Sequence, residues 1–291
     1  SQASRTMLMN IEDLQWDDTI IETFAIDKSK LCDLVPPNTN IGHVSEDFSK
    51  STGISKETQV IISGGDQQNA AIALRTIEAK TAQANTGTGS FVIAYSEKPA
   101  LDEKCRVVCS AAAIPGKYIV EAGIFNTGAI YRWFKDEFGY DQDGFNQLNQ
   151  EAIESPIGSN GVMLIPHFEG SAAPYWNPMS KGLFFNLSLG SKRGDLARSI
   201  LEGIALEIAE NIALIESMIG EVSTVAVAGG MTKFDLFNEI QANALNRKIT
   251  RYNNSEATSL GATINALVAL GEYETIEEAF AELIKEDPMV V

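Results

Sequence analysis

The feature that most constrains the fold is an alternation of strand and helix patterns in the C-terminal part of the chain. A β-branched stretch at residues 222–227 leads into the glycine pair Gly229-Gly230, and a helical pattern over residues 234–245 follows. A strand pattern at residues 248–252 and a helical pattern at residues 258–270 repeat this order. Such alternation is typical of an α/β fold whose sheet carries helices on both faces. Because ligands bind at the carboxyl ends of strands in these sheets, the glycine pair marks a candidate site.

Three β-prone segments precede this unit, at residues 90–95, 106–113 and 118–125. Short turns separate them, which predicts an antiparallel meander and therefore a mixed sheet. A helical pattern covers residues 129–138, and the longest one covers residues 196–219. The apolar residues of the longest pattern recur at helical spacing, so we expect a core helix.

A carboxylate directly after two glycines is the first candidate catalytic group. The strand pattern Val60-Ile61-Ile62 is followed by Gly64-Gly65 and then by Asp66. Glycines allow a sharp turn and close approach of a ligand, and a carboxylate there can serve as a general base. The alternative is that Asp66 caps a helix over residues 67–74. The local sequence leaves both interpretations open.

The segment Gly87-Thr88-Gly89 lies between β-prone flanks and predicts a tight hairpin. Its backbone N–H groups and the Thr88 hydroxyl could hold a phosphate group. The alternative is a simple turn without a ligand.

Composition excludes several classes of function. The 291 residues carry a net charge of −17, which argues against nucleic-acid binding because a phosphate backbone demands Lys and Arg. A site for phosphate would then depend on local backbone donors and a metal ion. No apolar run approaches the length of a membrane span, so we expect a cytoplasmic protein. The three cysteines, Cys32, Cys105 and Cys109, form neither a disulfide framework nor, with His43 and His167, a zinc set.

These motifs resemble, in type and order, those of the FGGY carbohydrate kinases. The matching segments are Gly64-Gly65-Asp66-Gln67-Gln68, Asn85-Thr86-Gly87-Thr88-Gly89, Pro174-Tyr175-Trp176-Asn177-Pro178, the helix start at residues 196–205 and Ala228-Gly229-Gly230. Within the family the resemblance is strongest to the glycerol kinases, through Ala3-Ser4-Arg5-Thr6-Met7-Leu8 and Trp16-Asp17-Asp18. Arg5 itself has a second interpretation, a simple ion pair with a nearby carboxylate.

The resemblance implies an actin-like (ribonuclease H-like) ATPase domain and the tail of a second, similar domain. Residues 1–75 would be the end of the sugar-binding domain, and residues 76–291 the ATP-binding domain. Such proteins transfer the γ-phosphoryl group of MgATP to a sugar or polyol hydroxyl in the cleft between the domains. The cofactors implied are ATP and Mg²⁺. The partners implied are a small-molecule substrate and a second copy of the chain, without nucleic acid or membrane.

The resemblance also assigns roles on the substrate side of the site. Asp66 matches the base that takes the hydroxyl proton, and Gln67 matches a substrate contact. Phe91 matches an aromatic residue that packs on the carbon skeleton of the substrate. Gly87 and Thr88 match the hairpin that holds the β- and γ-phosphates.

On the nucleotide side, Gly128 and Arg132 fall where family members contact the nucleotide. Gly229, Gly230 and Phe234 fall on the loop that contacts adenosine. No residue is assigned to the metal ion.

The resemblance leaves the substrate with alternatives. Glycerol is the first expectation, and xylulose, ribulose or gluconate are the others; a non-catalytic actin-like ATP-binding module is the alternative from another class. The Asp-x-Gly-Thr phosphate loop of the family has no counterpart in this sequence. We therefore expect a C-terminal portion of a kinase that is inactive alone.

Overall fold

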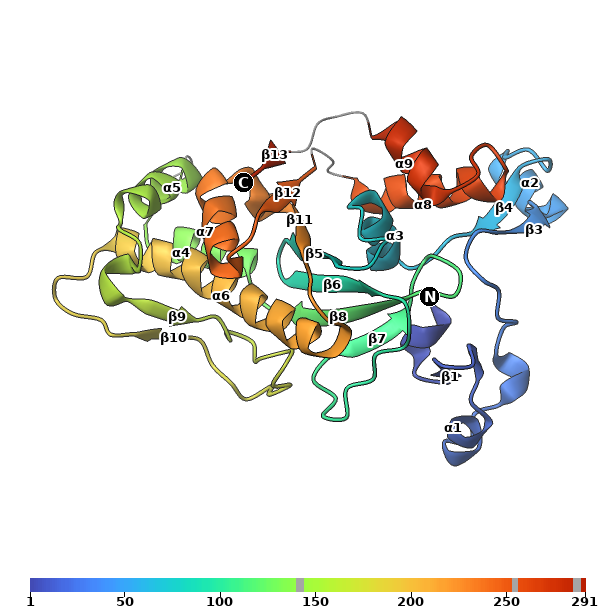
Figure 1. Cartoon of the computed structure of the whole chain (residues 1–291), viewed down its shortest axis with the longest axis horizontal. Coiled ribbons are helices and arrows are strands. Elements are labelled where there is room, and N and C mark those ends of the chain that lie inside the picture. The colour runs from blue at the N-terminus through green and yellow to red at the C-terminus, as the bar shows by residue number, and fades with distance from the viewer. Residues whose placement is uncertain (140–143, 253–255, 285–288) are drawn as a thin grey trace.

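The computed structural model describes residues 1–139, 144–252, 256–284 and 289–291, and its centre is a mixed β-sheet (Figure 1). Among these residues seven strands form the sheet, in the order β13-β12-β11-β5-β6-β8-β7. They are β5 (Thr81–Thr86), β6 (Ser90–Ser96), β7 (Val108–Ala111), β8 (Tyr118–Ile124), β11 (Thr224–Ala228), β12 (Ile249–Arg251) and β13 (Met289–Val290).

The pairing confirms a mixed sheet but corrects the predicted meander. Strand β11 runs parallel to β5 and β12, whereas β5 and β6, β6 and β8, and β8 and β7 pair antiparallel. β8 therefore lies between β6 and β7, and β7 is the edge strand. β8 is buried at six of its seven positions, whereas the four-residue β7 is buried at two. An interior strand has both edges paired and both faces covered, so the longer and more buried strand takes the inner place.

Helices cover both faces of the sheet, as predicted. One face carries α4 (Gly128–Glu137), α5 (Gly144–Glu154), α6 (Arg193–Ile219) and α7 (Asp235–Leu245). The other carries α3 (Asp66–Ala73), α8 (Ala257–Ala269) and α9 (Ile276–Leu283) (Figure 1). Alternate residues of β6 show the division, because Val92 packs in the same core cluster as Ile204 of α6, while Ile93 packs with Ile119 in a separate cluster.

Helix α6 is the core helix that its apolar spacing predicts. Ile200, Ile204, Ile208 and Ile212 are all buried to at least 99%. The helix begins at Arg193, three residues before the predicted start, because the Asp195 carboxylate accepts a hydrogen bond from the backbone N–H of Lys192 and caps it.

The remaining elements form small peripheral pieces. At the N-terminal end these are η1 (Ala3–Thr6), β1 (Met9–Asn10), β2 (Gln15–Trp16), α1 (Asp18–Thr23), η2 (Lys28–Lys30), β3 (Thr39–His43), α2 (Glu46–Thr52) and β4 (Gln59–Ile62). β1 pairs with β2, and β3 with β4. Between α5 and α6 in the sequence lie η3 (Ser159–Gly161), β9 (Met163–Ile165) and β10 (Leu183–Phe185). β9 pairs with β10 and packs against α6.

Candidate functional site

The predicted hairpin joins β5 and β6, and it is bound to the start of α4. The Gly87 N–H donates to the Gly89 carbonyl at 2.8 Å, which closes the turn. The N–H groups of Thr127 and Gly128 donate to the carbonyls of Thr88 and Gly87 at 2.9 and 3.0 Å. The start of α4 therefore fixes the position of the hairpin, and the hairpin carbonyls occupy the N–H groups that a helix start would otherwise offer to a ligand.

The hairpin, the start of α4 and the end of β11 come into close contact here, because glycines at the contacts have no Cβ atom. A Cβ atom on Gly128 would lie 2.3 Å from the Gly87 carbonyl oxygen. Gly229, at φ +94°, would place a Cβ atom 2.3 Å from the Thr86 carbonyl oxygen. The structure thus brings together the hairpin, the start of α4 and the end of β11, which the sequence analysis assigned separately to the nucleotide.

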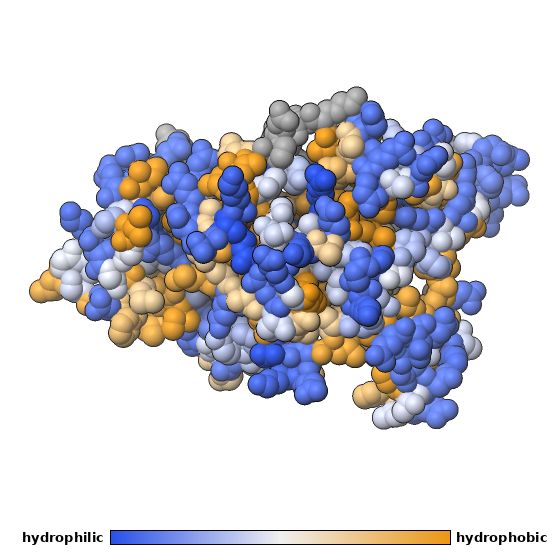
Figure 2. Space-filling view, viewed as in Figure 1, coloured by the Kyte–Doolittle hydropathy of each residue, from blue (hydrophilic) through white to orange (hydrophobic). Residues whose placement is uncertain are grey.

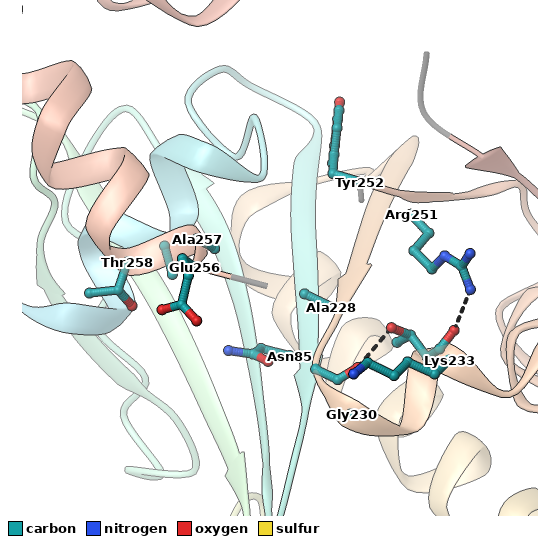
Figure 3. A pocket seen from close by; sticks show the side chains of 12 residues that line it. Asn85, Ala228, Gly230, Lys233, Arg251, Tyr252, Glu256, Ala257 and Thr258 are labelled. Carbon is teal, nitrogen blue, oxygen red and sulfur yellow. Dashed lines mark hydrogen bonds between the residues drawn. The ribbon is translucent and has the colours of Figure 1, made fainter. Parts of the chain in front are cut away.

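A cavity of about 400 Å³ opens beside the glycine pair. In Figure 3 Glu256, Ala257 and Thr258 at the start of α8 face Gly230 and Lys233 across it, with Asn85 between them. Gly230 and Lys233 bound the short helix η4 (Gly230–Lys233).

Two cationic side chains and one acidic side chain, Glu256, line this cavity, and Arg251 also forms an ion pair of 3.5 Å with Asp235. The cationic side chains are those of Lys233 and Arg251. The Arg251 guanidinium donates to the Thr232 carbonyl at 2.7 Å, and the Thr232 hydroxyl donates to the Gly229 carbonyl at 2.8 Å, so Arg251 also stabilises the turn (Figure 3). The sequence analysis missed Arg251 and Thr258. The only signal for Arg251 was its place at the carboxyl end of a predicted strand.

Asp66 is the first residue of α3, and its side chain is exposed. The N-cap position belongs to Gly65, one residue before the position that the capping interpretation gave to Asp66. The Asp66 carboxylate accepts a hydrogen bond from the N–H of Gln67 at 2.8 Å. The Thr258 hydroxyl donates to the Asp66 carbonyl at 3.3 Å. Because Thr258 lines the cavity at the glycine pair, Asp66 stands next to the start of α8 at its border.

A second cavity, of about 320 Å³, contains Phe91. Phe125 and Trp176 line it with Phe91, and Arg5 and Glu121 add a charged pair with 3.1 Å between Nη2 and Oε1. Burial raises the pKa of the Glu121 carboxyl, the charge of Arg5 counteracts this rise, and the negative charge of Asp66 adds to it. Arg5 thus makes the ion pair that was one of its two interpretations.

Seven of the ten predicted site residues lie outside the lining of both cavities: Asp66, Gln67, Gly87, Thr88, Gly128, Arg132 and Phe234. Arg132 is exposed on α4, and Phe234 packs half-buried against the core cluster at the start of α7. Gln67 is half-buried, and its Oε1 atom has no hydrogen-bond partner in the described part of the chain.

Two features are absent from the described residues, a cluster of metal ligands and a membrane-spanning helix. Within the ranges given above, no group of three or more His, Cys, Asp or Glu side chains could hold a metal ion. Over the same ranges, no helix combines the length and apolarity that crossing a bilayer demands.

Comparison with known proteins identifies two domain signatures. Residues 82–270 match the C-terminal domain of the FGGY family of carbohydrate kinases, and residues 1–73 match the N-terminal domain of the same family.

Proteins of similar sequence align with nearly the whole chain. A glycerol kinase of Thermococcus gammatolerans is 33% identical over 281 residues, covering 96% of this chain and 55% of that protein. A gluconokinase of Bacillus subtilis is 27% identical, covering 95% of this chain and 56% of that protein. The chain therefore spans little more than half the length of the curated relatives it matches.

Solved structures agree in fold. Plasmodium falciparum glycerol kinase with ADP superimposes with a TM-score of 0.87 at 26% identity, over 99% of this chain and 57% of that one. A ligand-bound xylulose kinase of Lactobacillus acidophilus gives 0.90 at 22% identity, over 97% of this chain and 57% of that one. These neighbours have the actin-like α/β fold, which confirms the predicted fold class. The chain belongs to the FGGY family of carbohydrate kinases.

Proposed function

We propose that the chain is the C-terminal portion of an ATP-dependent sugar or polyol kinase that transfers the γ-phosphoryl group of ATP to a substrate hydroxyl. FGGY carbohydrate kinases are phosphotransferases. The observation that carries the proposal is the place of Asp66, an exposed carboxylate whose backbone is bonded to Thr258 at the border of the glycine-lined cavity. Phosphoryl transfer needs a carboxylate to orient the attacking hydroxyl near the bound phosphates, and this arrangement supplies one.

In this proposal the nucleotide is held mainly by backbone. The hairpin of Gly87 and Thr88 is proposed to contact the β- and γ-phosphates, and Gly128 is proposed to lie against the nucleotide. Gly229 and Gly230 allow adenosine to approach the chain closely. Lys233 and Arg251, which line the same cavity, offset the negative charge of the phosphates.

The remaining assignments complete the proposal. Arg132 and Phe234 are proposed as outer nucleotide contacts, and Gln67 as a substrate contact. Mg²⁺ is proposed to enter with the nucleotide, because Mg²⁺ at such sites is bound through substrate phosphates and one or two carboxylates. The boundary between the sugar-binding and ATP-binding domains is proposed near residue 75, and the gap between the two family matches supports it.

We propose glycerol as the substrate. The glycerol kinases among the relatives support this choice, and the aromatic side chains around Phe91 suit a short carbon skeleton. Gluconate and xylulose are the alternatives, because a gluconokinase and xylulose kinases also align with the chain.

A homodimer is the proposed assembly. Figure 2 shows apolar side chains at the surface over β9, β10 and the loop that follows, where Met163, Phe185 and Leu187 are each more than half exposed. An apolar surface of this kind is typical of a protein interface. Sedimentation velocity would test the assembly, and a monomer at micromolar concentration would contradict it.

The function is tested with purified protein that contains this chain. ADP release is followed with MgATP and, in turn, glycerol, xylulose, ribulose and gluconate. We expect one substrate to stimulate ADP release, with Asp66→Asn lowering kcat by a factor of 100 or more, on the order of the contribution of a general base. ATP affinity should stay within twofold in Asp66→Asn, because the nucleotide contacts are unchanged. ATP binding without any substrate response would support the non-catalytic module instead.

A further inference from the structure

The short helix η1 is attached to the catalytic part of the molecule by polar contacts. The Ser4 hydroxyl oxygen accepts a hydrogen bond from the N–H of Ala111 at 3.2 Å. Arg5 pairs with Glu121 of β8 at 3.1 Å. Just before η1, the Ser1 hydroxyl oxygen accepts a hydrogen bond from the N–H of Gly65 at 2.9 Å. These contacts connect the edge of the sheet to the residue that directly precedes Asp66.

The central contact is a charged pair with unequal exposure. The Glu121 side chain is 7% exposed and that of Arg5 is 39% exposed. A carboxylate buried at this depth is costly unless a cation compensates for it, and Arg5 provides that charge. Asp66 adds a second negative charge, whose effect reaches Glu121.

The pair also borders the proposed substrate position. Arg5, Glu121 and Phe91 line the same cavity of about 320 Å³. Arg5 lies apart from the residues that line the cavity at the glycine pair. An effect of Arg5 on catalysis would therefore come from the substrate side and leave nucleotide affinity unchanged.

We propose that Arg5 is a positioning residue for Asp66: it fixes η1 to Glu121, so that Ser1 holds the Gly64-Gly65 turn. The inference rests on the proposed kinase function, in which Asp66 is the base. Arg5 acts through Glu121 and the turn. A displacement of about 1 Å at a catalytic group can cost about 100-fold in rate, so small shifts of the turn are sufficient.

The competing explanation is that the ion pair only stabilises the fold, and four variants separate the two. Arg5→Met keeps the length of the side chain and removes the charge, which leaves Glu121 buried without a cation. Glu121→Gln removes the buried charge. The double variant removes both charges, so its melting temperature should return toward that of the unmodified protein. Arg5→Lys keeps the charge and should restore part of the activity.

Kinetics are measured with the same protein that is used to test the proposed function. We expect kcat to fall about 10- to 100-fold in Arg5→Met and to remain low in the double variant, with KM for ATP within twofold. Arg247→Met is the matched control, because Arg247 forms an ion pair of 2.8 Å with Glu216 and lines neither cavity. It should lower stability and leave kcat unchanged. A double variant that regains both stability and full kcat overturns the proposal.

Amide hydrogen exchange supplies a second readout, on the chain itself. The segment of residues 59–72 should exchange faster in the double variant, while residues 81–94 keep their protection, because the Gly65 N–H loses its fixed acceptor. Unchanged exchange at residues 59–72 would overturn the proposal. If the unmodified protein phosphorylates none of the substrates, the proposed function fails and the role of Arg5 fails with it. If it is active and all Arg5 variants match it, only the role of Arg5 fails.

Discussion

Two regions of the chain are stabilised in different ways. In residues 1–62 only Ser4 and Ile21 are buried. In the region from residue 81 onward, one apolar cluster joins the strands of the sheet to α4, α5, α6 and α7. The N-terminal region therefore contributes few apolar contacts, and hydrogen bonds and the Arg5–Glu121 pair attach it to the sheet.

This difference separates the cavity at the glycine pair from the position of Asp66. The glycine-lined cavity is built on buried strands, which suits a ligand held by backbone. Asp66 stands where the two regions meet, at the start of α3, whose Ile72 packs with Ile264 of α8. Asp66, the proposed base, is thus held by α3 on one side and by polar contacts of η1 on the other.

The largest expected effect comes from truncating the apolar core. Ile204→Ala removes a side chain of α6 that is 0% exposed, and we expect a loss of about 2–5 kcal/mol in the free energy of unfolding. Ile41→Ala, in β3, removes a side chain that is 53% exposed and should cost less than about 0.5 kcal/mol. Urea unfolding of both variants measures the contrast, and equal losses would show that residues 1–62 are packed more tightly than their exposure indicates.

Substitutions at two glycines, one in the cavity and one outside it, test the backbone contacts of the cavity. In Gly229→Ala the new Cβ atom would sit on a residue with a φ of +94° and would lie 2.3 Å from the Thr86 carbonyl oxygen. We therefore expect a loss of about 2–4 kcal/mol in the free energy of unfolding and at least tenfold weaker ATP binding. Gly53→Ala has a φ of +77° but nothing within 4 Å, and should cost only about 1 kcal/mol. Calorimetric titration with ATP and urea unfolding compare the two. A Gly229→Ala protein that binds ATP normally would remove this turn from the proposed site.

Local patterns were sufficient to predict much of the fold. The hairpin at Gly87-Thr88-Gly89, the core helix α6 and the alternation after residue 222 follow from turn residues and apolar spacing within single segments. The order of β6, β8 and β7 did not, because strand pairing depends on contacts between distant segments.

The same limit applied to the site. Asp66 and the glycines could be singled out because they follow strand patterns, but the contribution of Thr258 and Arg251 to one cavity depends on how α8 and β12 pack. The Arg5–Glu121 pair joins residues far apart in the sequence, and the local sequence around Arg5 gave two interpretations. Long-range contacts of this kind leave no periodic signal.

A buried carboxylate in the packed region should make stability depend on pH. Burial, and secondarily the charge of Glu210, raises the pKa of Glu207 to about 7 from an ordinary value of 4.5. Between these values the folded chain binds more protons than the unfolded chain, so this group lowers stability as pH rises, with the full cost reached above about pH 7. Glu207→Gln should therefore gain on the order of 2–3 kcal/mol at pH 8 and little at pH 4.

Glu57→Gln is the matched control for Glu207→Gln, because Glu57 lies exposed in the N-terminal region. Its effect on the free energy of unfolding should be small at both pH values. Urea unfolding at pH 4, 6 and 8 gives the comparison. A gain from Glu207→Gln that is the same at every pH would mean that Glu207 keeps an ordinary pKa.

The smallest effect concerns an exposed ion pair. Lys50 and Glu46 of α2 approach to 2.7 Å, and their side chains are 69% and 76% exposed. Arg247 and Glu216, at 2.8 Å, are only 24% and 23% exposed.

Water and salt screen the pair of Lys50 and Glu46, so Lys50→Met should change the free energy of unfolding by less than about 0.5 kcal/mol. Arg247→Met should cost more, because it leaves a carboxylate that is largely removed from water without its cation. Urea unfolding at low and at 0.5 M salt compares the two pairs at nearly equal distance, and an equal cost would show that burial does not separate the two regions electrostatically.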